Sequence, residues 1–113
     1  MRNVPVTEFI QVLTTTPTKA MAETIADALV QERVAACVQV LGPISSVYRW
    51  RGQVEKAQEW LCFIKAKATD FQRVEQTIRI NHSYEVPEII ALPVQAGSED
   101  YLEWLRASLS SSA

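Results

Sequence analysis

The chain has 113 residues, enough for one domain of ordinary size and too few for two. Hydrophobic residues make up 48% of it, which allows a sizeable core and excludes a globally disordered protein. The net charge of -2 leaves no basic surface of the kind that nucleic-acid-binding proteins carry. We therefore expect a single domain over residues 1–113, with flexible ends at 1–6 and 110–113.

The first predicted elements are a strand and an amphipathic helix. Residues 8–15 are rich in β-forming side chains and predict the first strand. The segment Thr16-Pro17-Thr18 then predicts the start of a helix, with either Thr16 or Thr18 as its N-cap. The apolar side chains that follow share one helical face and carry the helix to about Arg33: Ala22, Ile25, Ala26, Leu29 and Val30.

A strand and a hairpin are predicted next. Residues 35–41 form an almost unbroken apolar run, as a central strand would, and Gly42-Pro43 bends the chain. Residues 44–51 and 54–67 flank Gly52, and glycine accepts the positive φ that a tight turn at Arg51-Gly52 requires. One face of the returning strand is apolar and carries Trp60, Cys62, Ile64 and Ala66.

The returning strand of this hairpin is too long for a compact domain. Its 14 residues at ~3.3 Å each would span about 46 Å, whereas a domain of this length has a diameter of about 35 Å. Either a bulge near Ala57-Gln58 breaks the strand, or the hairpin projects from the domain. A projecting ribbon with Tyr48, Trp50 and Trp60 would aggregate if left bare, so we expect oligomerisation to cover it.

Two helices and a strand are predicted in the last third of the chain. Thr69 and Gln72 have the spacing of a capping box, for a helix that reaches about Asn81. Residues 89–94 form a short aliphatic run bounded by prolines, which is typical of a buried strand. Residues 97–100 predict the start of a last helix, with acids at its positive end. Four side chains would line its inner side: Tyr101, Leu102, Leu105 and Leu109.

This order of elements predicts an α+β fold. Two βαβ halves in one short chain give a ferredoxin-like βαββαβ sandwich, with two helices on one face of an antiparallel sheet. The right-handed crossover rule leaves few other topologies. A long β-hairpin and an extra C-terminal helix complete the predicted architecture.

The segment from His82 to Glu88 holds the candidate site, because it gathers the only histidine, a tyrosine and two acids in front of a strand. His82, Cys37, Cys62, Glu85 and Glu88 are suitable metal ligands, and a soft thiolate favours copper(I) or zinc. No pair among them has the spacing of a metal motif, however. From spacing alone, a histidine that bonds its own turn and cysteines that pack as small hydrophobes are favoured over ligands.

Enzymatic activity is not expected. The only histidine has no nucleophile beside it in the sequence, and the likeliest nucleophile, Cys37, has no adjacent base. Neither a G-x-S-x-G motif nor a glycine-rich phosphate loop is present. Trp50, Trp60 and Trp104 are better explained by core and interface packing than by ligand stacking.

The sequence indicates a cytoplasmic protein. Its apolar runs are strand-sized, far below the roughly 20 residues that span a bilayer, and Met1 to Val6 do not have the pattern of a signal peptide. Cys37 and Cys62 are isolated in apolar strands, which is usual for reduced thiols in the cytosol.

Several stretches, taken in series from about residue 8 to 106, resemble the CutA family of divalent-cation tolerance proteins. The matching stretches are Val12-Leu13-Thr14-Thr15 with Pro17, Val34-Ala35-Ala36-Cys37-Val38, Ser46-Val47-Tyr48-Arg49-Trp50-Arg51-Gly52, Phe63-Ile64-Lys65, His82-x-Tyr84-Glu85-Val86-Pro87-Glu88-Ile89 and Tyr101-Leu102-x-Trp104. The chain departs from the family at Ser83, where a proline is usual. It also has Thr14-Thr15-Thr16 where some members carry a cysteine.

The resemblance implies a fold similar to the PII signalling proteins, a homotrimer assembled through the long hairpin, and a link to copper and divalent-ion tolerance. Animal members are connected with the anchoring of acetylcholinesterase. The leading hypothesis is therefore a cytoplasmic trimeric protein of metal-ion homeostasis, without an organic cofactor, that binds copper or another divalent ion near subunit clefts. Its proposed ligands are His82, Cys37 and Glu88.

Two further hypotheses stay open. In the first, the protein is a PII-like sensor or interaction scaffold without metal chemistry of its own. A cleft bounded by Tyr48, Trp50, Lys65, Tyr84, Glu85 and Glu88 would then hold a small molecule or a partner segment. In the second, the protein is a purely structural trimer.

Overall fold

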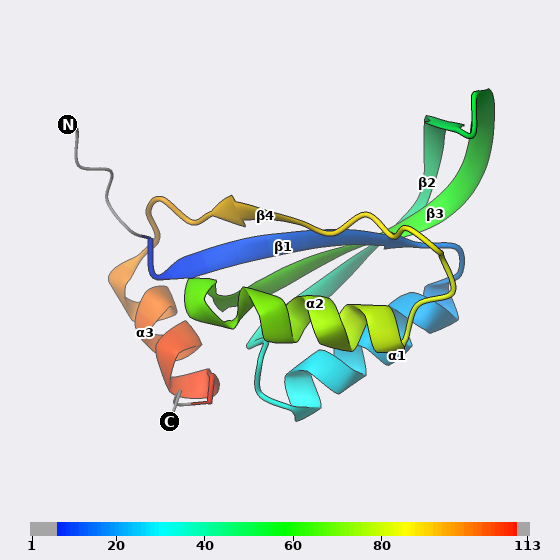
Figure 1. Ribbon diagram of the computed structural model, residues 1–113. Helices are drawn as coiled ribbons and strands as arrows, with labels where there is room; N and C mark the ends of the chain where they lie inside the picture. Colours follow the sequence, from blue (N-terminus) through cyan, green and yellow to red (C-terminus); the bar gives the residue numbers. More distant parts are fainter. Residues whose placement is uncertain (1–6, 111–113) are drawn as a thin grey trace.

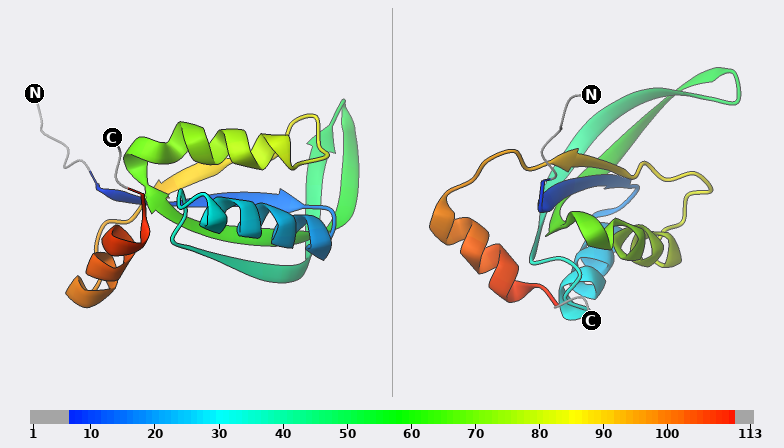
Figure 2. Two further views of the ribbon diagram at one scale, coloured as in Figure 1. Left: turned by 90° about the horizontal axis from the view of Figure 1, so that it is seen from below. Right: turned by 60° about the vertical axis from the view of Figure 1, so that its left-hand side comes forward.

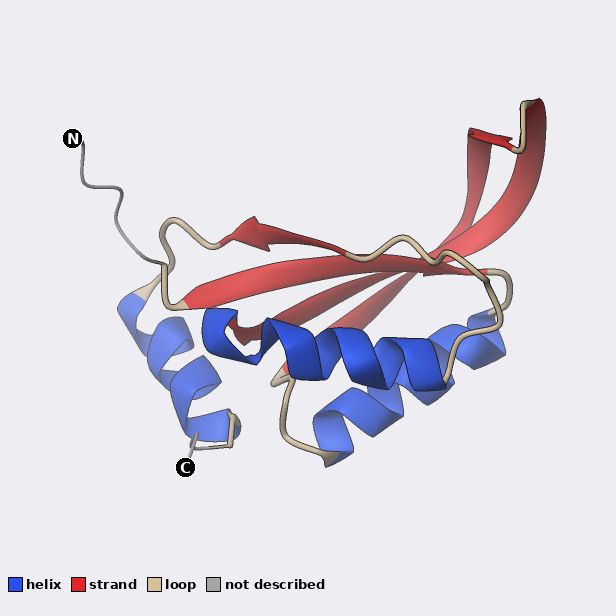
Figure 3. Ribbon diagram, viewed as in Figure 1, coloured by secondary structure: helices blue, strands red, loops and turns tan. Residues whose placement is uncertain are grey.

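A computed structural model describes residues 7–110. The order of the elements is βαββαβα, as expected from the sequence, and the four strands form one antiparallel sheet in the order β2-β3-β1-β4. Helices α1 (Lys19–Gln31) and α2 (Phe71–Ile80) cover one face of that sheet, and α3 (Glu99–Ser108) packs at one end (Figures 1 and 3). The ferredoxin-like α+β prediction is confirmed. The expected flexibility of residues 1–6 and 111–113 lies outside the described residues.

The main core lies between the sheet and these two helices. Strand β1 (Phe9–Thr16) contributes Val12, and α1 contributes the fully buried face predicted from its period: Ala22, Ile25 and Leu29. Of the two possible N-caps of α1, Thr18 is the one used, since its hydroxyl accepts the N–H of Met21 at 3.1 Å. Burial of this apolar face stabilises the helix more than its intrinsic propensity does.

The long hairpin is present and projects. Strands β2 (Cys37–Trp50) and β3 (Gln53–Lys67) are joined at Arg51-Gly52, where φ is 51° and 79°. The ribbon extends beyond the rest of the sheet (Figures 1 and 2). The radius of gyration is 15.1 Å, larger than the value of about 13 Å for a compact chain of this length. The hairpin therefore leaves the body of the domain.

The predicted bulge is on the other strand. The register shifts between Leu41 and Ile44 on β2, not near Ala57-Gln58 on β3. The two extra residues, Gly42-Pro43, carry a cis peptide bond and lie opposite Trp60. A Cβ at Gly42 would overlap the Trp60 ring, so glycine is needed there to let the indole approach the backbone.

Two strand assignments need correction. Residues 35–41 do not form a central strand, because β2 is an edge of the sheet. Strand β4 (Ile90–Pro93) is the opposite edge and is exposed, although residues 89–94 have the pattern of a buried strand. Aliphatic runs signal that both faces of a strand are to be covered. In one chain, the face turned away from α1 and α2 is left open.

The last two helices differ from the predictions in two respects. A short 3-10 turn, Ala68–Asp70, precedes α2, so the capping box of Thr69 and Gln72 does not form and Asp70 is the N-cap. Leu105 in α3 and Leu109 directly after it are buried as expected, but Tyr101 is 42% exposed. Ser110, the last described residue, donates its N–H to Arg33 O and accepts a bond from Lys67 at its carbonyl. Within residues 7–110, no helix has the length and hydropathy needed to cross a bilayer.

Candidate functional site

The single histidine is fixed through both ring nitrogens. Nε2 of His82 lies 2.7 Å from the carbonyl oxygen of Thr15, and Nδ1 lies 3.1 Å from the backbone N of Tyr84. A carbonyl can only accept, so Nε2 carries a proton and donates it, while the lone pair of Nδ1 accepts the Tyr84 N–H. His82 is therefore a neutral imidazole that bonds its own turn, as one of the sequence interpretations holds. Both nitrogens are used in holding that turn against β1.

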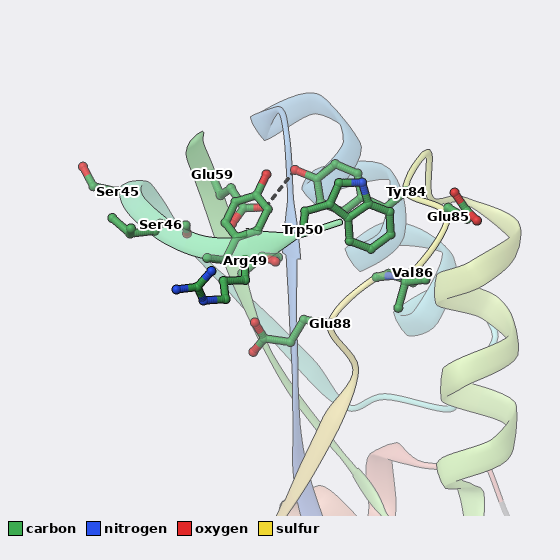
Figure 4. A pocket seen from close by; sticks show the side chains of 13 residues that line it. Ser45, Ser46, Arg49, Trp50, Glu59, Tyr84, Glu85, Val86 and Glu88 are labelled. Carbon is green, nitrogen blue, oxygen red and sulfur yellow. Dashed lines mark hydrogen bonds between the residues drawn. The ribbon is translucent and has the colours of Figure 1, made fainter. Parts of the chain in front are cut away.

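This turn places Tyr84 over a buried acid. The Tyr84 hydroxyl donates to Oε2 of Glu59 at 2.8 Å, and only 6% of Glu59 is exposed (Figure 4). Burial first, and then the neighbouring Glu59 carboxylate, raise the pKa of Tyr84 well above its usual range. The phenol thus keeps its proton at neutral pH and remains a donor to Glu59.

A cleft of about 880 Å³ opens beside this pair. Its walls come from four parts of the chain: Thr15 on β1, Ser45 to Trp50 on β2, Glu59 on β3, and the loop from Tyr84 to Glu88. The bulge of β2 and the turn held by His82 bring these segments together. A volume of this size suits a small organic molecule.

Most of the predicted cleft residues line it. Tyr48, Trp50, Tyr84, Glu85 and Glu88 are all at its walls. Lys65 lies outside it, since its ammonium donates to the side chain of Gln39 at 3.1 Å on the neighbouring strand.

The rim of the cleft carries an ion pair. The Glu85 carboxylate pairs with Arg51 at 2.8 Å, with both side chains about 70% exposed. Figure 4 shows this carboxylate pointing away from Glu59. An exposed pair of this kind contributes at most about 1 kcal/mol.

The candidate metal ligands lie apart within one chain. Cys37 pairs with Lys65, which pairs with Gln11 on β1, whereas His82 is bonded to Thr15. Gln11 and Thr15 are four residues apart on β1, which corresponds to about 13 Å. Cys37 and His82 are therefore separated by a distance of this order. Among residues 7–110, no three His, Cys, Asp or Glu side chains are grouped closely enough to hold a metal ion. One chain therefore does not supply the donor set of a closed tetrahedral site.

Glu59 is the main residue that the sequence interpretation missed. It shares a strand face with Leu61 and Phe63, because side chains alternate along β3. An acid beside Leu61 and Phe63 on one strand face is a signal that could have identified it. Its partner Tyr84 is 25 positions away, so the pairing itself could not be read from local pattern.

Comparison with known proteins matches this geometry to one family. The family model for the CutA1 divalent ion tolerance protein matches residues 10–108. The divalent-cation tolerance protein CutA of Thermus thermophilus is 45% identical over 95 residues, which are 84% of this chain and 92% of that protein. The chloroplastic protein CutA of Arabidopsis thaliana is 41% identical over 99 residues, 88% of this chain but 54% of the longer plant protein.

A solved structure agrees with these sequence relatives. The crystal structure of CutA1 from Oryza sativa superposes with a TM-score of 0.90 at 38% identity and covers 94% of this chain and 97% of that one. These relatives are described as divalent ion or divalent-cation tolerance proteins. With the long hairpin, the four-stranded sheet and the matched residues in agreement, this chain belongs to the CutA1 divalent ion tolerance protein family.

Proposed function

We propose that the protein is a homotrimer that acts in the tolerance of divalent metal ions and binds copper or another divalent ion near its subunit clefts. The match to the CutA1 divalent ion tolerance model over residues 10–108 carries this proposal. We place this activity in the cytoplasm, as the reduced cysteines indicate.

The proposed ligands are His82, Cys37 and Glu88. Glu88 is exposed and lines the cleft, and the half-buried Cys37 lies on the edge strand β2. Since these donors lie apart in one chain, the proposed site takes donors from neighbouring subunits. A metal ion at Nδ1 of His82 would have to replace the N–H of Tyr84, so occupation of the site would also loosen the turn.

Calorimetric titration of the protein with Cu²⁺ and Zn²⁺ tests this function. We expect binding by the wild type and a weakening of about tenfold or more in His82→Ala. Glu75→Gln removes an acid on α2, away from the cleft, and should leave the affinity unchanged. Equal affinities in the wild type and His82→Ala would remove His82 from the site, and no binding by either would contradict the metal function.

The cleft supports a second candidate, a PII-like small-molecule sensor or interaction scaffold. The observation that favours it is the cleft of about 880 Å³ with aromatic and acidic walls. Selective binding to the native state raises the unfolding midpoint by mass action. A thermal-shift screen with metal ions in one arm and small organic molecules in the other therefore separates the two functions.

A further inference from the structure

The buried acid of the cleft has no positive partner. Glu59 is 6% exposed, and within residues 7–110 its carboxylate accepts one hydrogen bond, from the neutral phenol of Tyr84. None of the ion pairs formed within residues 7–110 includes it. Burial of a carboxylate is costly unless a cation or several donors compensate for the lost water. A single hydrogen bond from a phenol does not fully compensate for the water that the Glu59 carboxylate loses on burial.

Aromatic side chains stand on the same strand face as this acid. In the hairpin, Ile44 lies opposite Glu59, Tyr48 opposite Glu55 and Trp50 opposite Gln53. Residues that lie directly opposite each other share a face, and every second residue returns to it. Tyr48 and Trp50 therefore face the same side as Glu59, and Arg49, which alternates to the other face of the strand, also lines the cleft.

At the rim of the cleft, another carboxylate of this chain has a cation as its partner. There, Arg51 neutralises Glu85 at 2.8 Å and also lies 5.2 Å from the centroid of the Trp50 ring. The guanidinium is thus held by a carboxylate and an aromatic ring together. Deeper in the cleft, Glu59 has the carboxylate and the aromatic walls, and although Arg49 also lines the cleft, none of the ion pairs within residues 7–110 joins it to Glu59.

We infer that the cleft binds a small organic cation, whose ammonium or guanidinium group is the counter-ion of Glu59 and whose apolar part lies against Tyr48 and Trp50. Tyr84 holds the carboxylate in place by donating to Oε2, which leaves Oε1 for the ligand. This inference rests on the second function proposed above and names the chemical class of its ligand.

Binding of n-butylguanidinium, compared with its neutral isostere n-butylurea, tests the inference. Both are titrated calorimetrically into the full chain at constant ionic strength, with MgCl₂ as an inorganic control. We expect n-butylguanidinium to bind and n-butylurea to bind at least tenfold more weakly. Equal binding of the two probes, or no binding of n-butylguanidinium, would overturn the proposal.

Two variants of β3 locate the charge that is responsible. Glu59→Gln keeps the shape of the side chain and should weaken n-butylguanidinium at least tenfold. Glu55→Gln removes the same charge from an exposed position outside the cleft walls and should change the affinity less than twofold. If Glu59→Gln does not fold, Trp50→Leu provides the second test, since loss of the ring should weaken the cation more than the urea.

The remaining outcomes separate this inference from the sensor function. Binding of a neutral or anionic small molecule, with no response to n-butylguanidinium, would overturn the cation proposal and leave the sensor function standing. If no small organic molecule in the thermal-shift screen raises the unfolding midpoint, the cation proposal and the sensor function are both overturned. If Glu59→Gln changes the mass of the assembly and not ligand binding, the counter-ion of Glu59 comes from a neighbouring subunit and the proposal is wrong.

Discussion

At the scale of single residues, the two cysteines occupy different environments. Cys62 is fully buried on the helix side of β3, whereas Cys37 is half-buried on the edge strand. Burial raises the pKa of the Cys62 thiol to about 11, and the thiolate is the form that reacts with alkylating agents. The two thiols should therefore react at very different rates.

We expect Cys62 to resist iodoacetamide in the native protein. A Cys37→Ser variant, which retains Cys62 alone, should be alkylated at neutral pH only after denaturation, while Cys62→Ala should still be modified at Cys37. Because the folded-state pKa is raised from 9.0 to about 11, the contribution of Cys62 to stability is full below pH 9 and is lost as the pH rises towards 11. Rapid alkylation of native Cys37→Ser, followed by mass spectrometry, would show that Cys62 is accessible.

Residue roles could be predicted from the sequence where the signal is local. The turn that His82 bonds and the buried position of Cys62 both follow from short patterns. The burial of Glu59 under Tyr84 could not be predicted in this way, because the contact depends on how the loop before β4 folds back over β3. The same limit applies to Lys65, whose exact partner depends on the register of β2 and β3.

At the scale of elements, caps and turns were less predictable than periodicity. The apolar period identified the buried face of α1, and Gly52 identified the hairpin turn. The capping box at Thr69 failed because the N–H of Ala68 bonds to the carbonyl of Glu8, and a 3-10 turn takes the first positions. Tertiary hydrogen bonds of this kind override a local capping preference.

The N-cap of α1 provides a test at this scale. Thr18→Ala removes the acceptor for the Met21 N–H and should lower the free energy of unfolding by about 1 kcal/mol. Thr24 is the matched control, since its hydroxyl bonds back to Ala20 O within the same helix, and Thr24→Ala should cost less than about 0.5 kcal/mol. Denaturant titrations of both variants measure the difference, and equal losses would show that Thr18 does not act as the cap.

At the scale of the whole molecule, the face of the sheet that α1 and α2 leave uncovered is the feature from which we predict assembly with other subunits. Strand alternation places Leu13, Leu61 and Phe63 on the face away from α1 and α2. The edge strands add side chains to the same face that are about half exposed: Leu41 54%, Ile90 49% and Leu92 47%. Large apolar side chains that gather half exposed on one face are typical of a protein–protein interface. The edges β2 and β4 also present unpaired backbone groups.

These surfaces favour a closed ring over a twofold dimer. The two edges differ greatly in length, with 14 residues in β2 and 4 in β4, and we expect the projecting β2–β3 hairpin of one subunit to pair with the β4 edge of the next. A head-to-tail contact of this kind either closes by rotation or forms a filament. The resemblance to the CutA family implies closure at three. We therefore predict a cyclic homotrimer whose isolated monomer is not stably folded.

Light scattering of the dilute protein should give close to three times the chain mass of 12.7 kDa. Leu92→Lys places a charge on the open face and should weaken assembly by about 2 kcal/mol per subunit, the value of burying one leucine side chain. The control is Ile80→Lys, because Ile80 is 74% exposed on α2, on the helix side of the sheet, and this variant should keep the mass of the wild type. A folded species of 12.7 kDa in the wild type, or the same loss of mass in both variants, would contradict assembly through the open face.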